Sequence, residues 1–144
     1  MATEADILAR FLAGELPAEE LTHRAHVRLA VATLRRYDFA ESVYRYSRAL
    51  RAAAGKAGRP GKFNQTQTIA FLSLIAERLA AGGGEDFEAF AARHPELFER
   101  ALLTSYYPRE RLSCALAHRT FLLPVPPAAP ATERTAAEPA ATAS

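Results

Sequence analysis

Apolar residues recur along most of the chain at intervals of three and four positions, the spacing that places side chains on one face of an α-helix. The clearest stretches are DILARFLA, HVRLAVATL and TIAFLSLIAERLAA. Alternation of apolar and polar residues, which would indicate β-strands, never extends beyond a few positions. The pattern therefore predicts an all-α protein.

Capping residues and glycines divide this pattern into about six helices. Glycines follow the apolar stretches near residues 14, 55 and 82–84. Residues 95–107, PELFERALLTSYY, indicate a further helix with its proline in the first turn. Because the connections are short and no heptad pattern persists, we expect a single compact orthogonal bundle. Four residues stand where N-caps are expected: Thr3, Thr22, Asp38 and Asn64.

The C-terminal end differs from the rest of the chain in composition. From Pro124 onward the sequence PVPPAAPATERTAAEPAATAS is rich in Pro, Ala and Thr, and Val125 is its only large apolar residue. Such a segment cannot bury enough surface to offset the entropy of ordering it. We therefore expect a helical domain over residues 1–123 and a disordered tail over residues 124–144.

Length and composition exclude several classes of protein. The 144 residues, 49% of them hydrophobic, suffice for one core. No apolar run approaches the roughly 20 residues of a membrane span, and the acidic N-terminal region does not resemble a secretory signal. Cys114 is the single cysteine, which excludes an intrachain disulfide and a four-cysteine zinc site. These features predict a cytoplasmic protein without membrane contact.

The charge is unevenly distributed although the net charge is only +2. Residues 35–62 hold eight basic residues and two acidic ones, which leaves a local charge of +6. Such a segment can attract an anionic ligand, while a solvated helix face and a basic loop explain the same charges. The stretch RYSRALRAAAG needs its tyrosines and apolar residues for packing, so we do not expect nucleic-acid binding.

Two of the four histidines, His23 and His26, occupy the first turn of the helix that Thr22 would cap. Residues three apart are neighbours on a helix. At a helix N-terminus the dipole and any desolvation both disfavour protonation, which leaves neutral imidazoles able to accept a proton or bind a metal. Both histidines are therefore candidate catalytic residues. The alternative is one hydrogen-bonded core histidine and one surface histidine.

Two further polar clusters interrupt apolar segments. Asn64 and Thr68 belong to KFNQTQT, which either caps the following helix or forms the floor of a polar pocket. Tyr106, Tyr107 and Arg111 belong to SYYPRERLS, whose phenols and guanidinium groups suit a carboxylate or phosphate. Together with the histidines, these five residues form a candidate site for an anionic or polar small molecule.

The signatures of phosphate-binding loops, zinc hydrolases and serine hydrolases are absent. We therefore expect no cofactor and no metal. One function that fits is a cofactor-free accessory enzyme of small-molecule metabolism with His23 or His26 as general base. Another is a non-catalytic ligand-binding or protein-interaction module. A metal site made of both histidines and Glu77 is a third, and the residues leave open whether the protein is an enzyme.

Four segments resemble a family of small bacterial all-helical proteins for which no activity is established: LTHRAHVRLAV, KFNQTQTIAFLSLIAERL, HPELFERALLTSYYPRERLS and AHRTFLLP. The family motifs are similar to THxxHVRVAW, KYHxTITWAF and RYYxxxxL, and the likeness spans roughly residues 10–124. It implies a helical fold with a site at these motifs. His23 and His26 match, whereas the family pattern has tyrosine, histidine and isoleucine where this chain has Phe63, Asn64 and Gln67. The resemblance thus implies a missing third imidazole, which argues against a metal.

Overall fold

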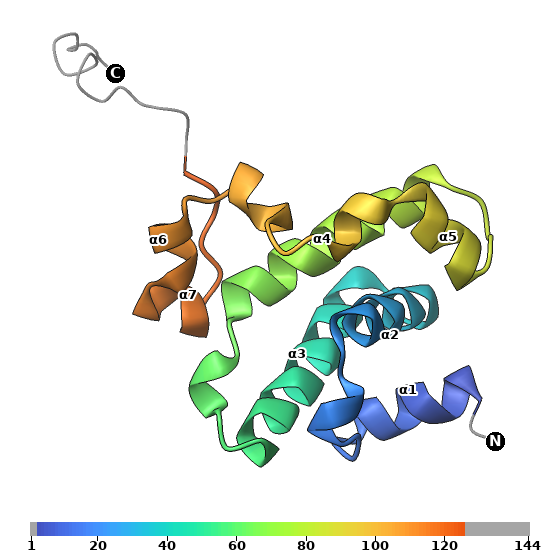
Figure 1. Cartoon of the computed structure of the whole chain (residues 1–144), viewed down its shortest axis with the longest axis horizontal. Helices are drawn as coiled ribbons and strands as arrows, with labels where there is room; N and C mark the ends of the chain where they lie inside the picture. The colour runs from blue at the N-terminus through green and yellow to red at the C-terminus, as the bar shows by residue number, and fades with distance from the viewer. Residues whose placement is uncertain (1–2, 126–144) are drawn as a thin grey trace, which may run out of the picture.

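The computed structural model describes residues 3–125, and every regular element within them is a helix (Figure 1). The predicted all-α fold is thereby confirmed. The α-helices of this part are α1 (Glu4–Leu12), α2 (His23–Arg36), α3 (Phe39–Lys56), α4 (Gln65–Ala81), α5 (Phe87–Arg93), α6 (Arg109–Ser113) and α7 (Ala115–Arg119). Short 3-10 turns connect them: η1 (Ala18–Glu20), η2 (Pro60–Lys62), η3 (Pro95–Phe98) and η4 (Leu102–Ser105). The disordered tail predicted for residues 124–144 lies outside the described residues from residue 126 onward.

The four predicted N-caps are confirmed. In each, the side-chain oxygen accepts a hydrogen bond from the backbone N–H three residues further on. Gly14 follows α1 with a φ of 76°, in the left-handed region that glycine adopts at little cost. Local side-chain chemistry therefore sets the starts of α1, α2, α3 and α4, including the start of α2 at the two candidate histidines.

The prediction of a single helix over residues 95–107 is wrong. This segment forms η3 and η4 instead, with extended backbone at Glu99 between them. Leu97 and Leu103 are both buried, but Leu97 belongs to the main core and Leu103 to a smaller cluster with α4. Residues six apart on a continuous α-helix point about 120° away from each other. The break lets each leucine reach its own cluster.

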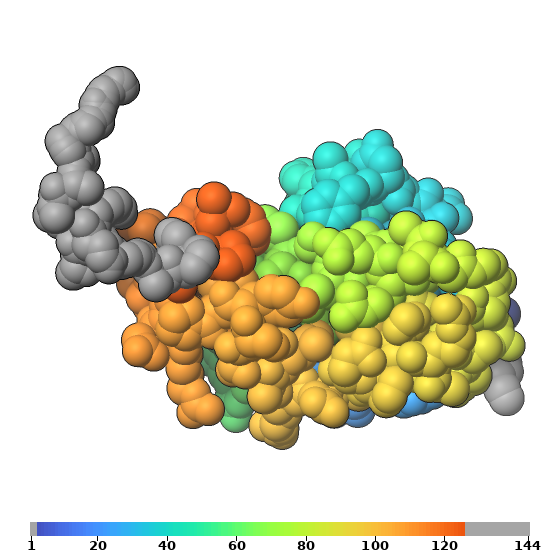
Figure 2. Space-filling model, turned by 90° about the horizontal axis from the view of Figure 1, so that it is seen from above, coloured from blue at the N-terminus to red at the C-terminus, as the bar shows by residue number. Residues whose placement is uncertain are grey.

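The long helix α4 organises the bundle. It contacts both α2 and α3, while α7 packs beside its first half (Figure 1). Figure 2 shows the orange residues around η4 lying alongside the green residues of α4, and η4 contacts α4. The fully buried side chains of the core include Val27, Tyr46, Leu72 and Ile75, which come from α2, α3 and α4. These three helices form the rigid base on which the candidate site is built.

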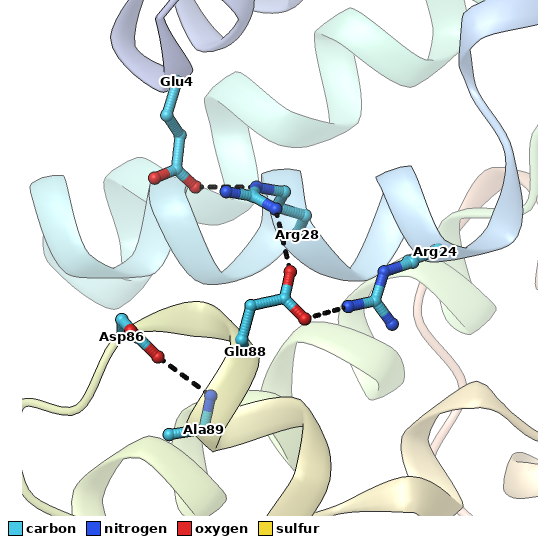
Figure 3. A network of polar contacts seen from close by, with 6 residues as sticks. All are labelled: Glu4, Arg24, Arg28, Asp86, Glu88 and Ala89. Atoms are coloured by element: carbon cyan, nitrogen blue, oxygen red, sulfur yellow. Dashed lines mark hydrogen bonds and ion pairs between the residues drawn. The ribbon is translucent and has the colours of Figure 1, made fainter.

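A network of ion pairs fixes the outer side of α2 (Figure 3). Glu88 of α5 accepts hydrogen bonds from Arg24 at 2.6 Å and from Arg28 at 3.4 Å, and Arg28 also donates to Glu4 of α1 at 3.1 Å. Both guanidinium groups also lie over the ring of Phe87. Because these charges are about half exposed, each pair contributes little alone. Together they tie the first two turns of α2 to α1 and α5.

None of the described helices combines the length and the apolar character that a membrane-spanning segment needs.

Candidate functional site

A cleft of about 740 Å³ lies between the N-terminal turns of α2 and α4, the C-terminal half of α3, and the turns η1, η2 and η4. Its volume falls in the range of roughly 300–1,000 Å³ that is typical of small-molecule sites. The α3 wall consists of one helical face with Tyr46, Leu50, Ala53 and Ala54, and Ala57 continues it directly after the helix. The small alanine side chains leave the space that the cleft occupies.

The two candidate histidines both line this cleft. His23 is exposed at its edge, with its ring centroid 6.4 Å from those of Phe71 and Phe98. His26 is half-buried one turn further along α2, and the hydroxyl of the buried Tyr46 donates a 2.8 Å hydrogen bond to its backbone carbonyl. This bond ties the backbone of the first turn of α2, which carries the His26 side chain, to α3.

The His26 ring has a perturbed acid–base equilibrium. Burial of the ring, reinforced by the neighbouring His23, holds the pKa of His26 below its usual value, and the Thr22 carbonyl opposes this by a smaller amount. Desolvation dominates because it removes water from the charged form. His26 therefore presents a neutral imidazole to the cleft at neutral pH, as expected for a residue that accepts a proton or a hydrogen bond.

Asn64 and Thr68 also line the cleft, but their polar groups are already engaged. The Asn64 side chain accepts a hydrogen bond from the Gln67 N–H at 2.9 Å and donates one to the Leu112 carbonyl at 2.7 Å. The Thr68 hydroxyl donates to the Asn64 carbonyl at 2.7 Å. Both side chains thus shape the floor of the cleft and have little capacity left for a ligand.

The structure does not bring the other predicted substrate-binding residues, Tyr106, Tyr107 and Arg111, into the cleft. Tyr107 is buried and its hydroxyl donates to the Leu122 carbonyl at 2.8 Å, while Arg111 Nε donates to the Leu123 carbonyl at 2.9 Å. Tyr106 is exposed. The prediction that these residues clamp an anion beside the histidines is therefore corrected. Tyr107 and Arg111 instead bind the extended backbone at Leu122 and Leu123.

Within residues 3–125, no three His, Cys, Asp or Glu side chains lie close enough together to hold a metal ion. Glu77, the carboxylate considered as a partner for the two histidines, is exposed on α4 and does not line the cleft. The three residues of that hypothesis are therefore not assembled in this structure.

Several lining residues were not singled out from the sequence as site residues. Phe63 and Phe71 supply aromatic walls, and Arg59, Lys62 and Arg100 lie on the exposed rim. The charge excess of residues 35–62 already includes two of these cations. Phe63 and Phe71 gave no such signal, because in the sequence they are indistinguishable from core residues.

Comparison of the chain with family models, with curated proteins and with solved structures finds no match in any of the three. The resemblance drawn from the four segments stays a prediction.

Proposed function

We propose that the protein binds a small molecule in the cleft, with His26 as the polar group that the ligand meets inside it. The observation that carries the proposal is a half-buried imidazole on a cleft whose other deep polar side chains, Asn64 and Thr68, already bond to the protein itself. A mainly apolar lining with one or two placed polar groups is typical of small-molecule sites. A concave shape of this kind suits a small ligand better than a flat protein partner.

The lowered pKa of His26 favours a second candidate function, a cofactor-free enzyme that transfers a proton. A general base works best when it is neutral at the working pH and within reach of a bound substrate. The lowered pKa of His26 supports the first condition, and its place on the cleft would bring the ring within reach of a substrate bound there. This activity would make the protein an accessory enzyme of small-molecule metabolism.

A cytoplasmic location fits either function, because the free, exposed Cys114 suits a reducing compartment.

The proposal is tested with N-phenyl-1-naphthylamine, an uncharged dye whose emission rises in apolar sites. We expect saturable binding with a stoichiometry of one to the full chain. The Ala53→Trp variant should lose or strongly weaken this binding, because Ala53 lies in the middle of the α3 wall and an indole there projects into the space of the cleft. The matched control is Ala40→Trp, an exposed position on the same helix that does not line the cleft.

Melting temperatures of both variants show that each one is folded. Absence of binding to the wild-type chain, or equal binding by a folded Ala53→Trp variant, would refute the proposal.

A further inference from the structure

The inner surface of the cleft and its rim differ in chemistry. The deep surface is aromatic and aliphatic, with Tyr46, Phe63 and Leu103 nearly or completely buried. The rim carries the cations Arg59, Lys62 and Arg100, all exposed. We propose that the ligand is an amphipathic anion whose apolar body lies inside the cleft and whose carboxylate or phosphate lies at Arg59 and Lys62. This inference rests on the proposed function, because it specifies the ligand of the same cleft.

The rim cations are available for such a head group. None of Arg59, Lys62 and Arg100 forms an ion pair within the described residues, where the ion pairs involve other bases. The rim also carries two carboxylates, Glu19 and Glu99, so three positive charges face two negative ones. Glu99 adjoins Arg100 in the chain and Glu19 belongs to η1, which leaves the η2 edge with its two cations as the positive side.

The surrounding backbone adds to this positive potential. The N-terminal turns of α2 and α4 both line the cleft, through His26 and Gln67 among others. Each helix presents the positive end of its dipole there, and two such ends at one site act together on an anion. In addition, the chain contains no Asp or Glu between Glu41 and Glu77, so α3 beyond its first turn, η2 and most of α4 contribute no negative charge.

The polar groups of the interior decide which end of the ligand lies inside. Asn64 and Thr68 are engaged with backbone groups, so a charged head placed deep in the cleft would meet only His26 as a free partner. Burying a carboxylate with so few partners is costly. At the rim, two cations and water can surround the head. An apolar body inside, with the head outside, satisfies both requirements.

Three probes with the same decyl chain test this assignment: undecanoate, decanol and decyltrimethylammonium, each titrated below its critical micelle concentration by displacement of N-phenyl-1-naphthylamine. Since the three share one ten-carbon alkyl chain, differences between them report on the head group. At low ionic strength we expect undecanoate to bind about tenfold more tightly than decyltrimethylammonium, with decanol between them. Decyl phosphate compares the two anionic heads. The preference for the anion should diminish as salt is added, which needs no variant protein.

The double variant Arg59→Gln, Lys62→Gln should bring the ratio of undecanoate to decanol affinity close to one, because decanol measures the binding of the same decyl chain within the same variant. The matched control is Arg109→Gln, Arg119→Gln, which removes two exposed arginines that do not line the cleft and should keep the wild-type ratio. Equal affinity for all three probes, tighter binding of the cation, or an unchanged ratio in the first double variant would overturn the ligand assignment. If the dye itself does not bind, the proposed function fails instead, so the two failures are distinguishable.

Discussion

The first turns of α2 and α4 look alike in the sequence, since polar side chains precede an apolar helix in both, yet the structure uses them differently. In α2, Thr22 caps the helix and the two histidine rings are left to face the cleft. In α4, the side chains of Asn64, Thr66 and Thr68 are all hydrogen-bonded to the protein. A polar cluster that interrupts an apolar segment therefore indicates either a binding surface or an attachment between two segments of the chain. The hydrogen-bond partners of its side chains distinguish the two.

The polar cluster at the start of α4 attaches residues 120–122 to the bundle. Thr66 is fully buried, and its hydroxyl donates to the Thr120 carbonyl at 2.7 Å while accepting from the Leu122 N–H at 3.0 Å. Tyr107 and Arg111 bond to the next carbonyls of the same extended segment. These contacts explain why two of the three predicted motifs turned out to be structural. They belong to the two sides of one internal attachment.

The largest expected effect is at Thr66. The substitution Thr66→Val keeps the shape of the side chain but leaves the Thr120 carbonyl and the Leu122 N–H without their partner. We expect the free energy of unfolding to fall by about 2 kcal/mol, measured by urea denaturation. The matched control, Thr104→Val, removes an exposed hydroxyl that bonds only within its own turn, and it should change stability by less than about 0.5 kcal/mol. Similar losses in both variants would contradict the role given to Thr66.

A smaller loss of stability is expected at Asn64. Its size distinguishes a residue that only caps α4 from one that also attaches α4 to Leu112. An aspartate is as good an N-cap as asparagine, so a cap alone would make Asn64→Asp neutral. The structure predicts a loss of about 1 kcal/mol instead, because aspartate cannot donate to the Leu112 carbonyl and turns an oxygen toward it. Asp38→Asn makes the reverse change at the exposed cap of α3, where the side chain only accepts from the Glu41 N–H. The Asp38→Asn control should hardly change the free energy of unfolding. Equal changes in both variants would mean that Asn64 acts only as an N-cap.

The smallest effect on stability is expected at His26. Above about pH 7, His26→Leu should leave the free energy of unfolding unchanged or slightly raised, since no folded-state bond of the side chain is essential to the bundle. On acidification the two chains should diverge. The unfolded chain takes up a proton near pH 6.5, while the folded chain resists protonation because the pKa of His26 is lowered. The wild type therefore loses stability relative to His26→Leu as the pH falls below about 6.5.

This pH dependence is measured as the difference in unfolding free energy between the two chains from about pH 7.5 to pH 5.5. The contribution of His26 should persist in His118→Leu, because His118 does not line the cleft. A constant difference between wild type and His26→Leu over this range would show that the ring is not held neutral by its surroundings.

Much of the fold could be predicted because its signals are local. The N-caps at Thr3, Thr22, Asp38 and Asn64 depend on a side chain and a backbone N–H three residues away, so a short stretch of sequence contains both partners. The placement of His23 and His26 on one helical turn is local in the same way. Residues 95–107 were misassigned because their break serves two separate clusters, and no local pattern records which cluster a leucine will join.

The sequence by itself determined the helical class, the main helix boundaries, the pairing of His23 with His26 and the positive charge of the segment that reaches η2. Only the tertiary structure decided which polar groups remain free. Asn64, Thr66, Tyr107 and Arg111 find their partners 12 to 56 residues away in the chain, and whether a hydroxyl or amide is satisfied depends on those distant groups. Neutral imidazoles at this helix terminus could be predicted from the sequence, but the burial that lowers the pKa of His26 is produced by tertiary packing.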